Sequence, residues 1–286
     1  MPTITLAGAE RFDLHSRATG RDYDIAVARP VPVAATGEVP ENCPIVIVLD
    51  SSLTFGTAVE RAAMYGAMGV LQSAVIVGVG YPGAMLEALH RRTPDFTPAT
   101  PQGKHAEMAT MIGTHYGDAD RFLDFLLDEL VPAVRNRAPE ASESRIILHG
   151  FSLAGLFATY ALMVRPDAFE TISIMAPSLW WNDFAVPAIL PRLEARLASG
   201  VRAPRVVMGV GALEQVEPDQ APPGLSLEDL RAKVREARML DAACELAEAL
   251  KRLPLAEFQF QIFDNEDHAG TLTAGTGRAI SFALRA

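Results

Sequence analysis

Three residues that can together activate a hydroxyl group follow one another along the chain. Ser152 lies in HGFSLAG, Glu214 follows in GALEQ, and His268 follows in NEDHAG. A serine hydroxyl is a weak nucleophile until a positioned base removes its proton. Histidine can act as that base, and a carboxylate can fix its tautomer and stabilise the imidazolium. This chain order is that of the α/β-hydrolase triad, so we expect nucleophilic attack on a carbonyl carbon and an acyl-enzyme.

The surroundings of Ser152 are those of a nucleophile elbow. An apolar run of strand character ends at Gly150, and a helix-like run begins near Leu153, so the serine falls in the tight turn between them. Such a turn requires small residues two positions before and after the serine, here Gly150 and Ala154. The spacing G-x-S-x-[GA] alone arises by chance roughly 0.2 times in a chain of this length. The flanking strand and helix turn the motif into a site prediction.

The acid is the least constrained member of the predicted triad. Asp241 and Asp264 also lie between the serine and the histidine. Glu214 is favoured because it ends a strand-like run at the expected place in the chain order. The alternative is that Glu214 is only a solvated loop carboxylate.

A serine hydrolase also needs backbone N–H donors for the oxygen that becomes negatively charged. We expect one donor to be Leu153, directly after the serine, and the other to be Ser51 or Ser52, after an earlier central strand. Removing one such donor costs about 3–4 kcal/mol in a comparable hydrolase. No cofactor is expected. No metal site is predicted either, because His105 and His115 are accompanied by no further set of ligands.

Strands and helices alternate along the chain that must position these residues. Strand-like runs are expected at 21–30, 43–50, 73–82, 144–150, 171–181, 205–214 and 257–268. Helical patterns occupy 57–70, 118–137, 153–163 and 227–253, with a final helix from about Thr273. Such alternation predicts a mostly parallel sheet with helices on both faces, and ligands at the carboxyl ends of its strands. The fold class is therefore α/β, with a single α/β-hydrolase domain over 1–286, in which 83–117 is a candidate lid.

Composition and charge exclude several classes of protein. Hydrophobic residues make up 49% of the 286 residues and charged residues 21%, as in a globular enzyme rather than a disordered chain. The net charge of −10 has the wrong sign for binding nucleic acid. No stretch approaches the ~18 apolar residues of a membrane span, and no signal peptide is evident. Cys43 and Cys244 are expected to be free thiols, so a cytoplasmic protein is predicted. The sequence indicates no oligomeric state.

Two pairs of residues are candidates for binding the substrate. Arg91 and Arg92 lie in LHRRTPDFTP and could recognise an anionic or polyphenolic group; alternatively they are surface arginines, one of them paired with Asp95. Trp180 and Trp181 could line an aromatic pocket, or could simply pack in the core.

The chain resembles the putative-esterase family of α/β-hydrolases, the group of esterase D-like and enterochelin-type siderophore esterases. The resemblance covers roughly Gly20 to Leu284 and is carried by GRDYDIAVARP, VLDSSLTF, VGVGYP, RRTPDFTP, FLDFLLDELVPAV, HGFSLAGLFATYAL, APSLWW, VGALEQ and NEDHAGTL. It implies ester hydrolysis by Ser152 and His268 without a cofactor, an acid at Glu214, and an oxyanion donor in LDSS. Some relatives work mainly with a Ser–His pair.

The chain departs from the family pattern at the expected catalytic centre. Relatives commonly have Asp-Gly-Asn where this chain has Asp50-Ser51-Ser52, and Gly-His-Ser-x-Gly-Gly where it has GFSLAG. A serine at position 51 matters only if that position requires a positive φ. By resemblance alone, the expected partner is a small-molecule ester of the siderophore type. Two alternatives stay open: a thioesterase or acyltransferase on the same fold, and a non-catalytic binding protein.

Overall fold

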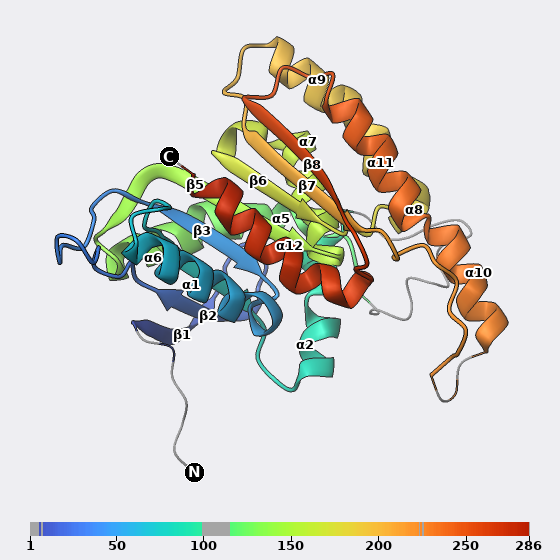
Figure 1. Cartoon of the computed structure of the whole chain (residues 1–286), viewed down its shortest axis with the longest axis horizontal. Helices are drawn as coiled ribbons and strands as arrows, with labels where there is room; N and C mark the ends of the chain where they lie inside the picture. Colours follow the sequence, from blue (N-terminus) through green and yellow to red (C-terminus); the bar gives the residue numbers. More distant parts are fainter. Residues whose placement is uncertain (1–5, 7, 99–114, 223, 225, 286) are drawn as a thin grey trace.

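A single eight-stranded sheet forms the centre of the molecule (Figure 1). The computed structural model describes residues 6, 8–98, 115–222, 224 and 226–285. The strand order is β1-β2-β4-β3-β5-β6-β7-β8. From β4 to β8 in that order every neighbouring pair is parallel, whereas β1 and β2 form an antiparallel edge. This is the mostly parallel sheet that the sequence predicts.

The strands are β1 (Ala9–His15), β2 (Asp22–Ala28), β3 (Cys43–Leu49), β4 (Val75–Gly80), β5 (Ala141–Phe151), β6 (Thr171–Met175), β7 (Arg205–Gly211) and β8 (Glu257–Phe263). The helices are α1 (Ser51–Ala67), α2 (Met85–Arg91), α3 (Thr93–Phe96), α5 (Ala119–Asp124), a π-helical segment (Phe125–Leu130), α6 (Val131–Arg137), α7 (Leu153–Val164), α8 (Trp181–Phe184), α9 (Leu190–Ala198), α10 (Leu227–Ala237), α11 (Met239–Leu250) and α12 (His268–Ala283).

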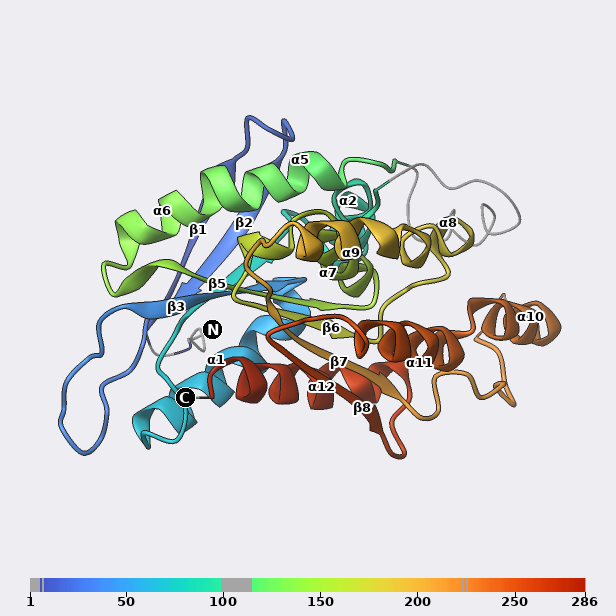
Figure 2. The ribbon, with the colours of Figure 1, turned by 90° about the horizontal axis from the view of Figure 1, so that it is seen from above.

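Helices cover both faces of the sheet. Figure 2 shows α5, α6, α7 and α9 on one face, and α1 and α12 on the other. The central strand β3 is consequently buried on both faces, with every residue from Ile45 to Leu49 fully buried. Val46 and Val48 pack with residues of α1 and α12, while Ile45 and Ile47 belong to the larger core on the opposite face. The continuous apolar run of β3 is what a strand buried on both faces requires.

Several elements differ from the sequence prediction, three of them next to the sheet edge or the candidate site. The edge strand β1 was not expected, because its residues AERFDLH are largely exposed and form no apolar run. Helix α1 begins at Ser51 instead of near 57, and the sequence does not signal this start, because the first turn begins with two serines and has no capping side chain. Helix α12 begins at His268 instead of near Thr273. The side chain of Asp267 caps it by accepting a hydrogen bond from the Gly270 N–H at 2.8 Å.

Part of the predicted lid at 83–117 belongs to the core. Residues 93–97 are buried, and the fully buried carboxylate of Asp95 accepts hydrogen bonds from Tyr23 at 2.8 Å and Tyr81 at 2.9 Å. Arg21 completes the cluster with an ion pair to Asp95. Burial raises the pKa of Asp95 to about 6, against the opposing effect of Arg21. Residues Met85–Arg91 of the predicted lid form α2, and residues 99–114, including His105, lie outside the described residues.

Two further sequence predictions concern the chain as a whole. Cys43 and Cys244 are free thiols, as predicted. Within the described ranges, no helix combines the length and apolar character needed to cross a membrane.

Candidate active site

Ser152 lies on a sharp turn between β5 and α7. Its backbone has φ 58° and ψ −118°, a conformation that is strained for a residue with a side chain. Two hydrogen bonds hold the turn: the Ser152 N–H donates to the Met175 carbonyl at 2.9 Å, and the Ser178 N–H donates to the Ser152 carbonyl at 3.0 Å. The turn is thus fixed against the end of β6, and the hydroxyl of Ser152 projects from it.

Small residues around Ser152 are required by direct backbone contacts. A Cβ atom at Gly150 would lie 2.1 Å from the Ala154 carbonyl oxygen. A Cβ atom at Gly155 would lie 2.8 Å from the Met175 carbonyl oxygen, so this position also needs glycine. The requirement at Gly150 agrees with the sequence prediction, whereas the requirement at Gly155 depends on β6 and could not be read from the motif.

His268 and Glu214 form a hydrogen-bonded chain that ends at Ser152. The His268 Nε2 atom lies 3.0 Å from the Ser152 Oγ atom, and its Nδ1 atom lies 2.7 Å from Glu214 Oε2. The carboxylate can only accept, so Nδ1 carries the proton and Nε2 is free to accept the serine proton. Of the acids considered, Glu214 is therefore the one that contacts His268. Asp241 instead accepts a hydrogen bond from Gln215 at 2.9 Å.

The loop after β7 fixes Glu214. Its side chain is fully buried, and its Oε1 atom accepts a hydrogen bond from the Gly211 N–H at 2.7 Å. The same loop docks against the segment that carries the histidine, because the Leu213 N–H donates to the Glu266 carbonyl at 3.0 Å. The carboxylate therefore has two directed contacts and no access to water.

His268 is the first residue of α12, and this position fixes its direction. The cap at Asp267 anchors the helix start. The imidazole ring lies 4.8 Å from the ring of Phe151, centroid to centroid, at an interplanar angle of 36°. The histidine side chain is 46% exposed, whereas the side chain of Glu214 is fully buried. The Ser152 end of the hydrogen-bonded triad is therefore the end that is open to a substrate.

The three predicted oxyanion donors all lie at helix N-termini. Leu153 begins α7, and Ser51 and Ser52 begin α1. In the described part of the chain, none of these three backbone N–H groups donates to a protein acceptor. The positive φ of 56° belongs to Asp50, so the serine at position 51 carries no backbone strain of this kind.

The two predicted arginines have different surroundings. Arg92 is 12% exposed at its side chain and forms an ion pair with Asp50, which is 6% exposed. Burial raises the pKa of Asp50, and Arg92 opposes that rise. Arg91 is exposed and lines a pocket of about 550 Å³ together with Tyr81 and Tyr116. Of these two arginines, Arg91 is therefore the one that lines a pocket.

The two predicted tryptophans are mainly packing residues. Trp181 is fully buried and Trp180 is 9% exposed, with their rings 6.0 Å apart. The ring of Trp181 lies 5.2 Å from Tyr116, which lines the 550 Å³ pocket. An aromatic wall of that pocket is thus formed by Tyr116, with Trp181 behind it.

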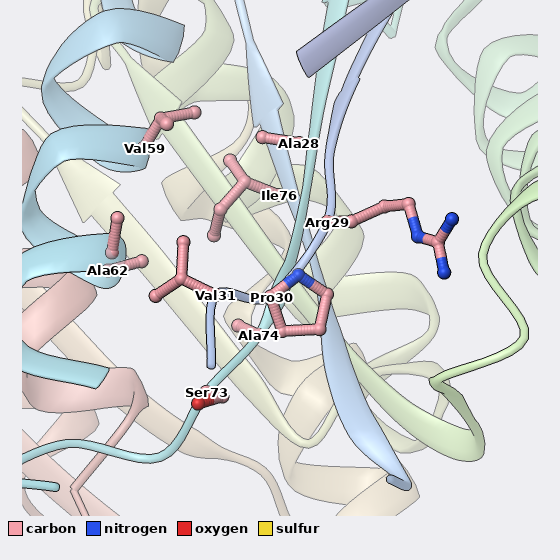
Figure 3. Close-up of a pocket in the computed structure, with 10 residues that line it drawn as sticks. Ala28, Arg29, Pro30, Val31, Val59, Ala62, Ser73, Ala74 and Ile76 are labelled. Atoms are coloured by element: carbon pink, nitrogen blue, oxygen red, sulfur yellow. The ribbon is translucent and has the colours of Figure 1, made fainter. Parts of the chain in front are cut away.

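Two other pockets lie at opposite ends of the sheet, and one of them adjoins the candidate oxyanion donors. One of about 270 Å³ is lined by Asp50, Ser51 and Ser52, and shares Tyr81 with the 550 Å³ pocket. The other, drawn in Figure 3, lies at the opposite end of the sheet, near Ile76, the second residue of β4, and holds only about 20 Å³. A space of that size holds about one water molecule, so it is no substrate site.

His149, just before the elbow, has a structural environment. It is fully buried, with Nδ1 3.0 Å from Ser173 Oγ and Nε2 3.1 Å from Thr276 Oγ1. The Thr276 hydroxyl donates its only proton to the Leu272 carbonyl at 2.6 Å, so it must accept from Nε2. Burial lowers the pKa of His149 to about 4, and the neutral ring links β5, β6 and α12.

Two contributors to the site were not identified from the sequence. Ser178 supports the elbow through its N–H, and its hydroxyl lies 3.5 Å from the Ser152 hydroxyl. Asp50 carries the buried ion pair beside the candidate donors. The serine within SLWW was quoted only as part of the family pattern. Nothing local in the sequence pairs Asp50 with Arg92. Among the described residues, no group of three or more His, Cys, Asp or Glu side chains could hold a metal ion.

Comparison with known proteins gives relatives along nearly the whole chain. The chain is 31% identical to the ferri-bacillibactin esterase BesA of Bacillus subtilis, over 98% of this chain and 91% of that protein. It is 30% identical to the siderophore triacetylfusarinine C esterase of Aspergillus fumigatus, over 97% of this chain and 94% of that protein. Among solved structures, the siderophore hydrolase EstB from Aspergillus nidulans matches with a TM-score of 0.82 and 27% identity, covering 100% of this chain and 98% of that one.

The sheet, the helices on both of its faces and these neighbours together identify an α/β-hydrolase fold. The family model described as "Putative esterase" matches residues 16–247. The chain therefore belongs to the putative esterase family.

Proposed function

We propose that the protein is a serine esterase in which Ser152 is the nucleophile, His268 the general base and acid, and Glu214 the residue that orients the imidazole. The hydrogen-bonded chain from Glu214 through His268 to Ser152 carries this proposal, with its two contacts of 2.7 and 3.0 Å. Each member has the exposure that its role requires: the carboxylate is buried, and the imidazole is accessible.

The reaction follows from this geometry in two stages. Ser152 Oγ attacks the ester carbonyl carbon while its proton passes to His268 Nε2, and Glu214 stabilises the resulting imidazolium. The carbonyl oxygen becomes an oxyanion, for which the N–H groups of Leu153 and of Ser51 or Ser52 are the proposed donors. His268 then returns the proton to the departing alcohol. Water, deprotonated by the same imidazole, hydrolyses the acyl-enzyme and restores the Ser152 hydroxyl.

For the substrate, we propose an ester of the siderophore type. The support is that one relative is a siderophore triacetylfusarinine C esterase and that EstB is a siderophore hydrolase. The pockets of about 550 and 270 Å³, which share Tyr81, offer room for a large ester next to the candidate donors. Arg91 and Tyr116 are the proposed contacts on the substrate side. The cytoplasmic location stays a prediction from the sequence.

Neither alternative function is favoured by a particular contact. A thioesterase or an acyltransferase would use the same three residues. A non-catalytic binding protein has no need of a strained serine in a complete hydrogen-bonded chain with a histidine and a buried acid.

The first test is ester hydrolysis with Ser152→Ala. Wild-type protein should hydrolyse p-nitrophenyl acetate, butyrate or octanoate, and Ser152→Ala should lose at least about 10³-fold in kcat/KM, because no nucleophile remains. Ser199→Ala is the matched control, since this exposed serine at the end of α9 should leave turnover unchanged. Equal turnover by wild type and Ser152→Ala would refute the nucleophile.

A second assay separates a narrow esterase from a binding protein. A fluorophosphonate probe should label wild-type protein at Ser152, as shown by peptide mass spectrometry, and should not label Ser152→Ala. Ferric and iron-free trilactone or linear tri-ester siderophores are then incubated with the protein, and the products are identified by mass spectrometry. Labelling without hydrolysis of any siderophore ester would contradict the proposed substrate class but not the nucleophile.

A further inference from the structure

We propose that Arg92 is a positioning residue for the oxyanion donors: it holds the carboxylate of Asp50 away from the N–H groups of Ser51 and Ser52 and cancels its charge. The proposal rests on the esterase function proposed above. This role takes the place of the direct contact with the substrate that the sequence suggested for Arg92, because the Arg92 side chain is largely buried and paired with Asp50.

The first observation is an aspartate that does not cap its helix. Asp50 directly precedes α1, where an aspartate side chain ordinarily accepts a hydrogen bond from the second or third N–H of the helix. Here Asp50 has φ 56° and ψ 55° and makes no such bond. Its backbone carbonyl, instead of its carboxylate, accepts from Leu53 at 2.8 Å and Thr54 at 3.2 Å. The first two N–H groups, of Ser51 and Ser52, are left without a partner in the described part of the protein.

The second observation is where the carboxylate goes instead. It forms a hydrogen-bonded ion pair with the Arg92 guanidinium. Arg92 is itself fixed, because its N–H donates to the Ala88 carbonyl at 3.1 Å and its guanidinium lies 5.7 Å from the ring centre of Phe96. The segment between α2 and α3 thus supplies a rigid cation that determines the direction of the Asp50 side chain.

The third observation concerns electrostatics. Asp50 is adjacent in the chain to the proposed donors and lines the same 270 Å³ pocket as Ser51 and Ser52. A carboxylate without a partner there would be a negative charge beside the place where the carbonyl oxygen becomes negative. Like charges repel strongly where water is excluded. Pairing with Arg92 removes this repulsion, so the donors face the pocket with their positive ends unopposed.

The neighbouring arginine has a separate role. Arg91 is exposed and lines the 550 Å³ pocket, whereas Arg92 is absent from the residues lining either that pocket or the 270 Å³ pocket. The two neighbouring arginines in LHRRTPDFTP thus have different roles: Arg91 is the proposed contact for the ligand, and Arg92 positions the segment that carries the Ser51 and Ser52 donors. This division predicts different kinetic effects: a change at Arg91 should act on KM, and a change at Arg92 should act on kcat.

The test is a double-mutant cycle on kcat with a p-nitrophenyl ester. Arg92→Met keeps the length of the side chain but frees the Asp50 carboxylate to repel the oxyanion or to cap Ser52. It should lower kcat by about 10- to 100-fold, up to the loss of one oxyanion donor, with KM within about twofold. Adding Asp50→Asn removes the freed charge, and the double variant should recover kcat to within about fivefold of wild type.

The matched control is Arg145→Met. Arg145 is also partly buried and pairs with Glu170 at 2.8 Å, but it lies near the amino end of β5, away from the site. Its loss should leave kcat unchanged, so that a general loss of an ion pair is distinguished from the effect at Arg92. Thermal unfolding of each variant is measured to verify that it is folded.

Several outcomes would overturn the proposal. Wild-type kcat in Arg92→Met, a change in KM alone, or a double variant no faster than Arg92→Met would each refute it. If Arg92→Met does not fold, Arg92→Lys and the double variant replace it. Both should keep kcat within about fivefold of wild type, and a loss beyond about tenfold in both refutes the proposal. Absence of Ser152-dependent turnover in the wild type is a different result, because it refutes the esterase function itself.

Discussion

Replacing Glu214 by glutamine should force the wrong tautomer on His268. In the structure, Glu214 Oε1 accepts from the Gly211 N–H at 2.7 Å, while Oε2 faces His268 Nδ1 at 2.7 Å. A glutamine must keep its carbonyl oxygen on the Gly211 N–H, since two donors cannot face each other. Its NH₂ group then points at Nδ1, which becomes an acceptor. The ring proton moves to Nε2, where the base must be free to take the proton of Ser152.

The size of the effect follows from the charge that is lost. With the charge centres of the carboxylate and the imidazolium about 4 Å apart and an effective dielectric constant of about 20, their attraction is ~4 kcal/mol. This corresponds to a loss of about 10³-fold in kcat/KM for Glu214→Gln. Glu214→Ala removes the same charge but imposes no tautomer, so it should be no slower than Glu214→Gln. His268→Ala removes the base itself and should be slower than either.

The assay is kcat/KM for a p-nitrophenyl ester at constant pH, with urea unfolding of each variant to verify its stability. The key comparison is between Glu214→Gln and Glu214→Ala. Activity of Glu214→Gln within tenfold of wild type would refute the coupling of the carboxylate to the reaction. A Glu214→Ala variant clearly slower than Glu214→Gln would refute the tautomer explanation. A collapse of Glu214→Gln equal to that of His268→Ala would instead indicate that the three residues act as one unit.

Two further predictions concern stability. Burial lowers the pKa of His149 to about 4, so the folded protein binds fewer protons than the unfolded chain between pH 4 and the ordinary value of 6.5. The resulting contribution to the free energy of unfolding is about 3 kcal/mol. It is fully present above pH 6.5 and is lost as pH falls through about 4. The raised pKa of Asp95 acts oppositely over nearly the same interval, so urea unfolding of wild type and His149→Gln is compared across it; a constant difference would contradict the prediction. Gly150→Ala should lower the free energy of unfolding by at least about 2 kcal/mol, because its Cβ would lie 2.1 Å from the Ala154 oxygen. Gly56→Ala is its control, since nothing lies within 4 Å of the added Cβ, and equal stability of the two variants would disprove the clash.

The sequence predicted those parts of the site that depend on local patterns. The elbow at Ser152 could be recognised because a strand, a tight turn and a helix follow one another within a few residues. The parallel strands could be recognised because β3 and its neighbours are buried on both faces and are therefore apolar throughout. Glu214 and His268 come shortly after two such strands in the sequence. Their placement close together at one edge of the sheet could therefore also be inferred.

What could not be predicted depends on contacts between distant segments. From RRTPDFTP, both arginines were candidates for binding the substrate, Arg91 slightly the stronger, and the alternative paired one of them with Asp95. The structure instead pairs Arg92 with Asp50, and Asp95 with Arg21, which directly precedes β2. The left-handed backbone of Asp50 turns its side chain away from α1, and no local pattern encodes that direction. The edge strand β1 was missed for a related reason, because its pairing with β2 leaves most of its side chains exposed.

The position of His268 at the start of α12 makes the order of synthesis relevant to activity. The histidine follows Ser152 by 116 residues. At about 5–20 residues per second, a ribosome needs about 6–23 s to pass from the serine codon to the histidine codon. During that time a nascent chain can carry the elbow but has no base to activate its hydroxyl. Packing of α12 on the sheet, which also places Thr276 beside His149, is what brings the proposed base to the serine. In the proposed mechanism, turnover therefore requires that this late segment has folded onto the earlier ones.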